Sequence, residues 1–174
     1  MRRRQGCGLD PLPAPSQAAP DQQPMRAPLT ILSLVCVVTL PLAGQTSVTG
    51  VRPLSFGTVF PGVASVVSRT DPANSGQFDL KGHPGGTASL TFLLPAVMTG
   101  PAGATLPLVF GGSDGGFSAS QSINTQVAFD PRTPYLATFV GNRASVFLGG
   151  TANPSPGQRA GSYTGTVTLT VVFF

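Results

Sequence analysis

The residues that could carry chemistry are few and lie far apart along the chain. After residue 44 there is one histidine, no cysteine and no glutamate, and the four aspartates are Asp71, Asp79, Asp114 and Asp130. His83 precedes Pro-Gly-Gly in a predicted turn, without the Cys, Glu or neighbouring Asp that a transition-metal site needs. No serine has the G-x-S-x-G setting of an activated nucleophile. These residues predict no enzyme, no catalytic or metal site and no cofactor.

The aspartates are predicted to stabilise turns, because three of them stand beside breakers, in Asp71-Pro72, Asp114-Gly115 and Asp130-Pro131. A glycosidase needs two carboxylates at a defined separation, and no pair here is favoured. The glycine-rich stretch 111–116 has neither the Lys-Ser/Thr of a phosphate loop nor the ligand-dense repeat of a calcium site. It predicts a flexible loop between strands.

The charge pattern argues against nucleic-acid binding. The whole chain carries 10 basic and 6 acidic residues, but part of that excess precedes residue 44. The basic residues beyond that point are spread singly: Arg52, Arg69, Lys81, Arg132, Arg143 and Arg159. No stripe among them could follow a phosphate backbone.

The first 44 residues are predicted to be targeting sequence. Residues 25–44 have a short basic start, an apolar run over 29–40 and small residues at Ala43 and Gly44, which is typical of a secretory signal helix. The run is shorter than the about 20 residues of a membrane span, so cleavage is favoured over a retained anchor. Gln45 replaces the cysteine that a lipid anchor would require. Residues 1–24 are expected to be disordered, and Met25 is a candidate true start.

The exported portion, residues 45–174, is therefore expected in the periplasm, at the cell surface or in the medium, with no stable membrane span. Both cysteines, Cys7 and Cys36, lie in the leader. A disulfide framework is thereby excluded, and core burial with strand pairing must hold the domain together.

Composition and periodicity both predict an all-β fold. The chain has 22 glycines and 18 prolines but only 16 charged residues, too many breakers and too few charges for solvated helices. Apolar residues recur at every second position, most clearly over 163–173 and 87–94. Shorter candidate strands are 54–60, 63–67, 77–80, 106–110, 125–129, 136–140 and 144–148.

Seven to nine short strands with Gly and Pro turns predict an immunoglobulin-like, fimbrial-type β-sandwich, preceded by the signal helix. An outer-membrane barrel is the architectural competitor, since the chain ends in an aromatic, Phe174. With no tryptophan and two tyrosines, however, the chain lacks the aromatic girdles of such barrels.

The order of several motifs resembles a bacterial secreted family, domain of unknown function 4402. The motifs are Leu-Ser-Phe-Gly-Thr-Val at 54–59, Phe-Asp-Leu-Lys-Gly at 78–82, Leu-Gly-Gly-Thr at 148–151 and the closing stretch 161–171. This family is similar to spore coat protein U and, more remotely, to fimbrial subunits.

The fimbrial resemblance implies a mechanism of assembly. In such subunits a glycine fourteenth from the end and a penultimate aromatic mark the strand that a periplasmic chaperone pairs with, and Gly161 and Phe173 occupy these places. The implied assembly strand comprises Gly161, Tyr163, Gly165, Val167, Leu169, Val171 and Phe173. The same residues would also suit an ordinary terminal strand.

The expected function is a non-enzymatic, exported structural or surface protein, a fimbria-like subunit assembled by β-strand donation. Its expected partners are a periplasmic chaperone, an outer-membrane usher and like subunits. The alternative is a self-contained secreted binding module that uses its inter-strand loops, especially residues 111–122.

Overall fold

The computed structural model describes residues 45–174, so the expected upstream segment 1–24 and signal helix 25–44 lie outside the described residues. The described part is all-β, as predicted, with one short 3₁₀ turn, η1 (Pro101–Gly103). Its strands are β1 (Ser47–Arg52), β2 (Ser65–Val67), β3 (Gly76–Lys81), β4 (Thr87–Leu93), β5 (Val97–Thr99), β6 (Thr105–Val109), β7 (Gly115–Ser118), β8 (Val127–Phe129), β9 (Tyr135–Thr138), β10 (Arg143–Leu148), β11 (Gly150–Ala152) and β12 (Thr168–Phe173).

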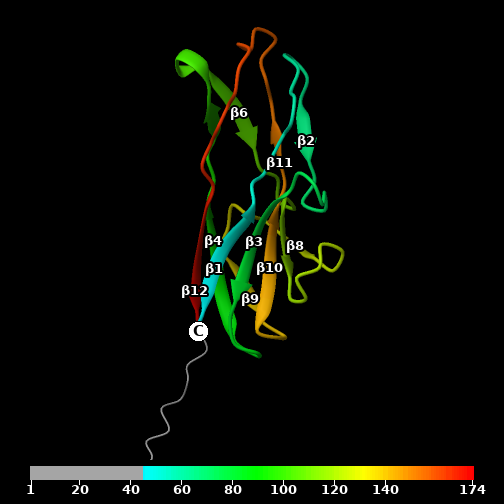
Figure 1. The fold of residues 1–174 in the computed structure, drawn as a ribbon, viewed down its shortest axis with the longest axis vertical. Coiled ribbons are helices and arrows are strands. Elements are labelled where there is room, and N and C mark those ends of the chain that lie inside the picture. The colour runs from blue at the N-terminus through cyan, green and yellow to red at the C-terminus, as the bar shows by residue number, and fades with distance from the viewer. Residues whose placement is uncertain (1–44) are drawn as a thin grey trace, which may run out of the picture. The chain divides into compact units, whose positions relative to one another are not determined.

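The strands form three antiparallel sheets, consistent with a β-sandwich (Figure 1). One layer has the order β1-β3-β10-β7-β8, and the facing layer has the order β12-β4-β9. Both layers lead into the third sheet, β2-β11-β6-β5. In the chain, β10 of the first layer is followed by β11, and β4 of the facing layer is followed by β5. The first and last strands, β1 and β12, are both edge strands, one in each layer.

The passage from β10 to β11 depends on glycine. The N–H of Gly149 donates to the carbonyl of Asp114 at 2.8 Å. A Cβ at this position would lie 2.5 Å from the carbonyl oxygen of Val67 and 2.7 Å from the amide nitrogen of Arg69. Both are backbone atoms that cannot rotate away, so β2 can lie this close to the chain only because residue 149 has no side chain.

The core lies between the two facing layers and is rich in phenylalanine. Its fully or nearly fully buried members come from both layers: Leu80, Ala88, Leu90, Phe117, Phe129, Ala137, Phe139, Ala144 and Val146. Phe139 is at the centre, with its ring centroid 6.2 Å from that of Phe117 and 5.9 Å from that of Phe173. Phe129 stacks on Tyr135 at 4.3 Å. Such aromatic contacts supply much of the burial that a disulfide-free domain requires.

Most predicted strands are present with boundaries shifted by no more than two residues, namely those now seen as β2, β3, β4, β6, β8, β9 and β10. The terminal strand is shorter than expected, because regular pairing with β4 begins at Thr168 and not near Tyr163. Upstream, only an isolated bridge joins Thr164 to Thr99.

The strand predicted over residues 54–60 is wrong. Pro53 precedes this segment, Gly57 has a φ of 61°, and the N–H of Ser55 bonds to the carbonyl of Asn74 and not to a ladder. The apolar alternation in this segment comes from Leu54 and Phe56, which are partly buried although the segment pairs with no strand.

The glycine-rich stretch is also different from the prediction. Gly115 and Gly116 begin β7, a fully buried strand between β10 and β8. A Cβ on Gly115 would lie 2.8 Å from the ring of Phe129. The glycines therefore allow close packing inside the sandwich and do not make the whole stretch a flexible loop.

Candidate functional site

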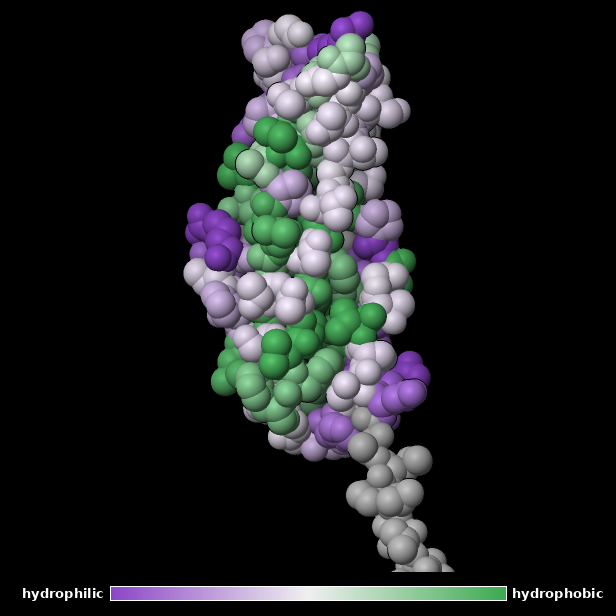
Figure 2. Space-filling model, turned by 90° about the vertical axis from the view of Figure 1, so that its left-hand side faces the viewer, coloured by the Kyte–Doolittle hydropathy of each residue, from purple (hydrophilic) through white to green (hydrophobic). Residues whose placement is uncertain are grey.

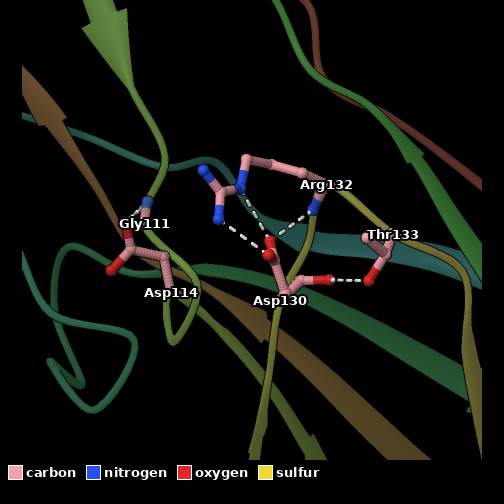
Figure 3. Close-up of polar contacts among 5 residues, drawn as sticks. All are labelled: Gly111, Asp114, Asp130, Arg132 and Thr133. Atoms are coloured by element: carbon pink, nitrogen blue, oxygen red, sulfur yellow. Dashed lines mark hydrogen bonds and ion pairs between the residues drawn. The ribbon is translucent and has the colours of Figure 1, made fainter.

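The aspartates of the turns bond to backbone, as the sequence predicts. Asp71 accepts bonds from the N–H of Ala73 at 2.8 Å and of Asn74 at 3.1 Å. The side-chain bond from Asn74, followed by these backbone bonds, lowers the pKa of Asp71. Asp114 accepts from the N–H of Gly111 at 2.6 Å (Figure 3).

Asp79 differs from the other aspartates because it lies within β3. It accepts bonds from the hydroxyl of Ser145 at 2.6 Å and from the side chain of Gln77 at 3.1 Å. His83 is exposed in its turn. Within residues 45–174, no three His, Cys, Asp or Glu side chains gather as a metal site.

Asp130 and Arg132 form an ion pair at the turn before β9 (Figure 3). Arg132 donates from Nε at 2.9 Å and from Nη2 at 2.7 Å to the two carboxylate oxygens, and its backbone N–H donates at 3.0 Å. Chiefly through the side-chain bond, Arg132 lowers the pKa of Asp130 from 3.8 to about 2. The two side chains bond to each other, and Asp130 also accepts the backbone N–H of Arg132. The pair therefore stabilises this turn.

This ion pair predicts an acid-dependent contribution to stability. Because the folded pKa of Asp130, about 2, is below the ordinary value of 3.8, the pair stabilises the fold above pH 3.8 and loses that effect as the pH falls toward 2. The melting temperature of the original protein should exceed that of D130N by a constant margin between about pH 5 and 7. Calorimetry at decreasing pH should show the margin vanish near pH 2. A margin that persists unchanged at that pH contradicts this role.

A groove lies between one segment near the start of the described chain and one near its end. Its upper part, of about 570 Å³, is lined by residues 54–59 on one side and 158–163 on the other, with Met98 and Leu106 at its base. Its lower part, of about 410 Å³, runs between residues 50–54 and 165–167. Both parts include Leu54, so they adjoin at this residue, and the segment 165–167 on the lower wall leads into β12.

The core side of β12 is only half covered along the seam between the edge strands β12 and β1. Leu169, Val171 and Phe173 point toward the core yet are half-buried, whereas Ala88 and Leu90 of the neighbouring β4 are fully buried. Figure 2 looks at the side where β1 and β12 lie and shows an apolar stripe along it. The sandwich is therefore open between its first and last strands.

Both strands that border the seam have a free backbone edge within the described residues. The N–H of Phe174 bonds to the carbonyl of Thr87, and hydrogen-bonded pairs alternate along an antiparallel ladder. Val172, Thr170 and Thr168 therefore also bond to β4, while the N–H and C=O groups of Phe173, Val171 and Leu169 point to the open edge. β1 pairs with β3 alone.

The upper end of the predicted assembly strand is fixed by local packing. A Cβ on Gly161, whose φ is 145°, would lie 2.3 Å from Pro101. The ring of Tyr163 occupies the space beside Gly100, and its hydroxyl donates to the carbonyl of Arg159 at 2.7 Å and accepts from Gln158 at 2.6 Å. These contacts give Gly161 and Tyr163 a structural role at the wall of the groove.

The remaining residues of the predicted strand line the same seam. Gly165 and Val167 border the lower part of the groove, and Leu169, Val171 and Phe173 follow in β12. Sequence reasoning did not find the opposite wall, residues 54–59. The apolar residues in this segment predict a paired strand and give no indication of a groove wall.

Comparison with known proteins identifies one family. A family model described as Domain of unknown function (DUF4402) matches residues 36–173. No curated protein and no solved structure matches the chain. In residues 45–174, no helix is long and apolar enough to cross a membrane.

Proposed function

The chain belongs to the DUF4402 family, and from this premise we propose that it is a non-enzymatic exported structural protein, a fimbria-like subunit assembled by β-strand donation. The supporting observations are the groove, whose lower part lies between the end of β1 and the segment 165–167 that leads into β12, and the free backbone edges of these two strands. A donated strand would pair with such an edge, and its alternate apolar side chains would cover the half-buried core residues.

The backbone of the seam sets the register that a donated strand would adopt. Leu169, Val171 and Phe173 offer N–H and C=O groups at the open edge and also place their side chains in the core layer. An incoming strand would therefore bond at every second residue of β12 and insert every second side chain between the layers. Like subunits, or a chaperone and usher before them, are the proposed donors.

β1 is the proposed donor within the chain. Val48 and Val51 are 40% and 53% exposed, so β1 adds little to the core. Arg52 fastens its end, with bonds to the carbonyls of Ser75 at 2.7 Å and Pro72 at 2.6 Å. Exchange of β1 between copies would thus mainly break backbone pairing with β3 and these bonds of Arg52.

Deleting residues 45–52 tests this proposal. Protein exported by a bacterial host should form oligomers larger than a dimer, and the deletion should leave no species larger than a dimer because the donor strand is lost, as measured by light scattering after size exclusion. A synthetic peptide of residues 45–53 should raise the melting temperature of the truncated protein by refilling the edge.

The control for this deletion is V66K, a change at a 72% exposed position of β2 away from the seam. It should leave the oligomers intact. Oligomers larger than a dimer that survive the deletion would count against donation by β1, and protein that is strictly monomeric at every concentration would count against assembly altogether.

A secreted binding module is the second candidate. The upper part of the groove, about 570 Å³, has the size of a small-molecule pocket, and Leu54, Phe56 and Met98 make it partly apolar. The loop proposed from the sequence is less suitable, because Ser118 bonds to the backbone of Ser122 at 3.1 Å and draws the loop onto the sheet. A monomer that binds an apolar small molecule would favour this candidate.

A further inference from the structure

The strands of one layer of the described sandwich, β12, β4 and β9, carry no charged side chain. No residue of β4, β5, β6, β9 or β12 is Asp, Glu, Lys, Arg or His. The charged residues and the histidine lie on β1, β3 and β10 or in connecting segments: Arg52, Arg69, Asp71, Asp79, Lys81, His83, Asp114, Asp130, Arg132, Arg143 and Arg159. With so few charges in the chain, this segregation leaves a full sheet surface uncharged.

The outward side chains of β12, β4 and β9 form what we call the uncharged face. Its members are Thr168, Thr170, Val172, Thr87, Ser89, Thr91, Leu93, Leu136 and Thr138. The pairing places them in rows across the sheet, such as Thr170 beside Thr91, and Ser89 between Val172 and Leu136. Leu93 and Leu136 are 73% and 64% exposed. The face therefore exposes large apolar side chains among uncharged threonines and serines, as contact surfaces between proteins often do.

Beyond β4 the same composition continues along the third sheet. β5 follows after Pro95, with Val97 and Thr99 exposed, and β6 exposes Thr105 and Val109 while Leu106 is buried. Thr99 pairs with Thr164, which extends the column of threonines on the last strand. Along β4, which has 7 residues, the neutral surface is about 23 Å long at about 3.3 Å per residue.

We propose that the uncharged face is a self-association surface and that its partner is the same face of a second copy. Two neutral sheet faces can pack at about 10 Å without removing any charge from water. A charged partner would lose hydration here and find no opposite charge. Threonine and valine have few rotamers to lose on burial, so ordering this face costs less entropy than ordering lysine and glutamate.

The size of the face sets the strength of this contact. The 6, 7 and 4 residues of β12, β4 and β9, at about 3.3 Å per residue and about 4.8 Å between strands, cover about 270 Å² on each copy. The total, about 540 Å², is in the range of weak, transient contacts, below the about 1,000 Å² of a stable specific interface. We therefore expect a weak, reversible dimer that becomes important where copies are concentrated side by side. The exposed Asp130–Arg132 pair stands in the turn before β9, where it would belong to a polar rim.

This surface is separate from the groove, so the inference does not depend on the proposed function. The proposed strand donation uses the backbone edge and core side of β12, whereas the uncharged face uses the opposite side of the same strand. Strand donation would join copies through their edges, and the uncharged face would join copies laterally. Both contacts can coexist in one assembly.

Charged substitutions within the face test the proposal. Sedimentation equilibrium of exported protein, with its N-terminus identified by mass spectrometry, should show a dimer whose dissociation constant is nearly independent of salt between about 50 and 500 mM. L93K/L136K should weaken dimerisation at least about tenfold, because lysines would face a neutral surface. Both positions are exposed, so the variant should keep its melting temperature.

The matched control is V66K/V127K, which introduces the same charges at positions 72% and 58% exposed on β2 and β8. It should dimerise as the original protein does. Equal weakening by both variants would overturn the proposal, as would a monomer at about 1 mM. Deletion of residues 45–52 should leave this dimer unchanged, which distinguishes it from strand donation; loss of the dimer on that deletion would also overturn the proposal.

Discussion

Replacing Phe139 by alanine is expected to lower the free energy of unfolding by about 3 to 5 kcal/mol. Phe139 is 1% exposed, and its ring contacts rings from both layers, Phe117 and Phe173. It also covers Gly82, where a Cβ would lie 3.0 Å from the ring. Removing the ring therefore leaves a cavity lined by residues held in several strands, which cannot all move in to fill it.

That loss is large compared with the total stability of a domain, about 5 to 15 kcal/mol. Urea denaturation followed by circular dichroism measures it directly. F174A is the matched control, because Phe174 is 75% exposed and its truncation should change stability by less than about 0.5 kcal/mol. Equal effects of the two variants would mean that Phe139 is not at the centre of the core.

The core could be predicted from the sequence because it depends on alternation within single strands. Leu90 and Ala88 share a face in β4, and Leu169, Val171 and Phe173 share a face in β12. Their orientation follows from the period of two. Because residues 45–174 contain no cysteine, burial and strand pairing must stabilise this part of the chain.

The groove could not be predicted because it depends on contacts between distant segments. Leu54 and Tyr163 face the same cleft across more than half of the described chain, and no local pattern encodes that approach. β1 was missed for a related reason: with Val48 and Val51 both exposed, its strand conformation comes from backbone pairing with β3 and not from burial. β7 was missed because its glycines serve packing where they usually indicate a loop.

Proline substitutions at two adjacent positions of β12 should give opposite results. The N–H of Val172 bonds to β4 in the ladder, so V172P removes a hydrogen bond inside the sheet and should prevent accumulation of folded protein. The N–H of Val171 points to the open edge, where proline is tolerated. V171P should therefore fold, with a lower melting temperature because part of the valine packing is lost.

The two variants separate the fold from the assembly edge. If a donated strand pairs with β12, V171P should be a folded protein that no longer forms oligomers dependent on residues 45–52, because the edge has lost a donor and gained a bulky ring. Circular dichroism reports folding, and light scattering reports assembly. Folded V171P that still assembles would exclude this edge as the site of strand donation. Well-folded V172P would show that the N–H of Val171, and not that of Val172, bonds to β4. The edge of β12 beside Val171 thus links a strongly periodic strand of the sequence to the proposed function, because the residues that complete the core are also those whose backbone is left open to a partner.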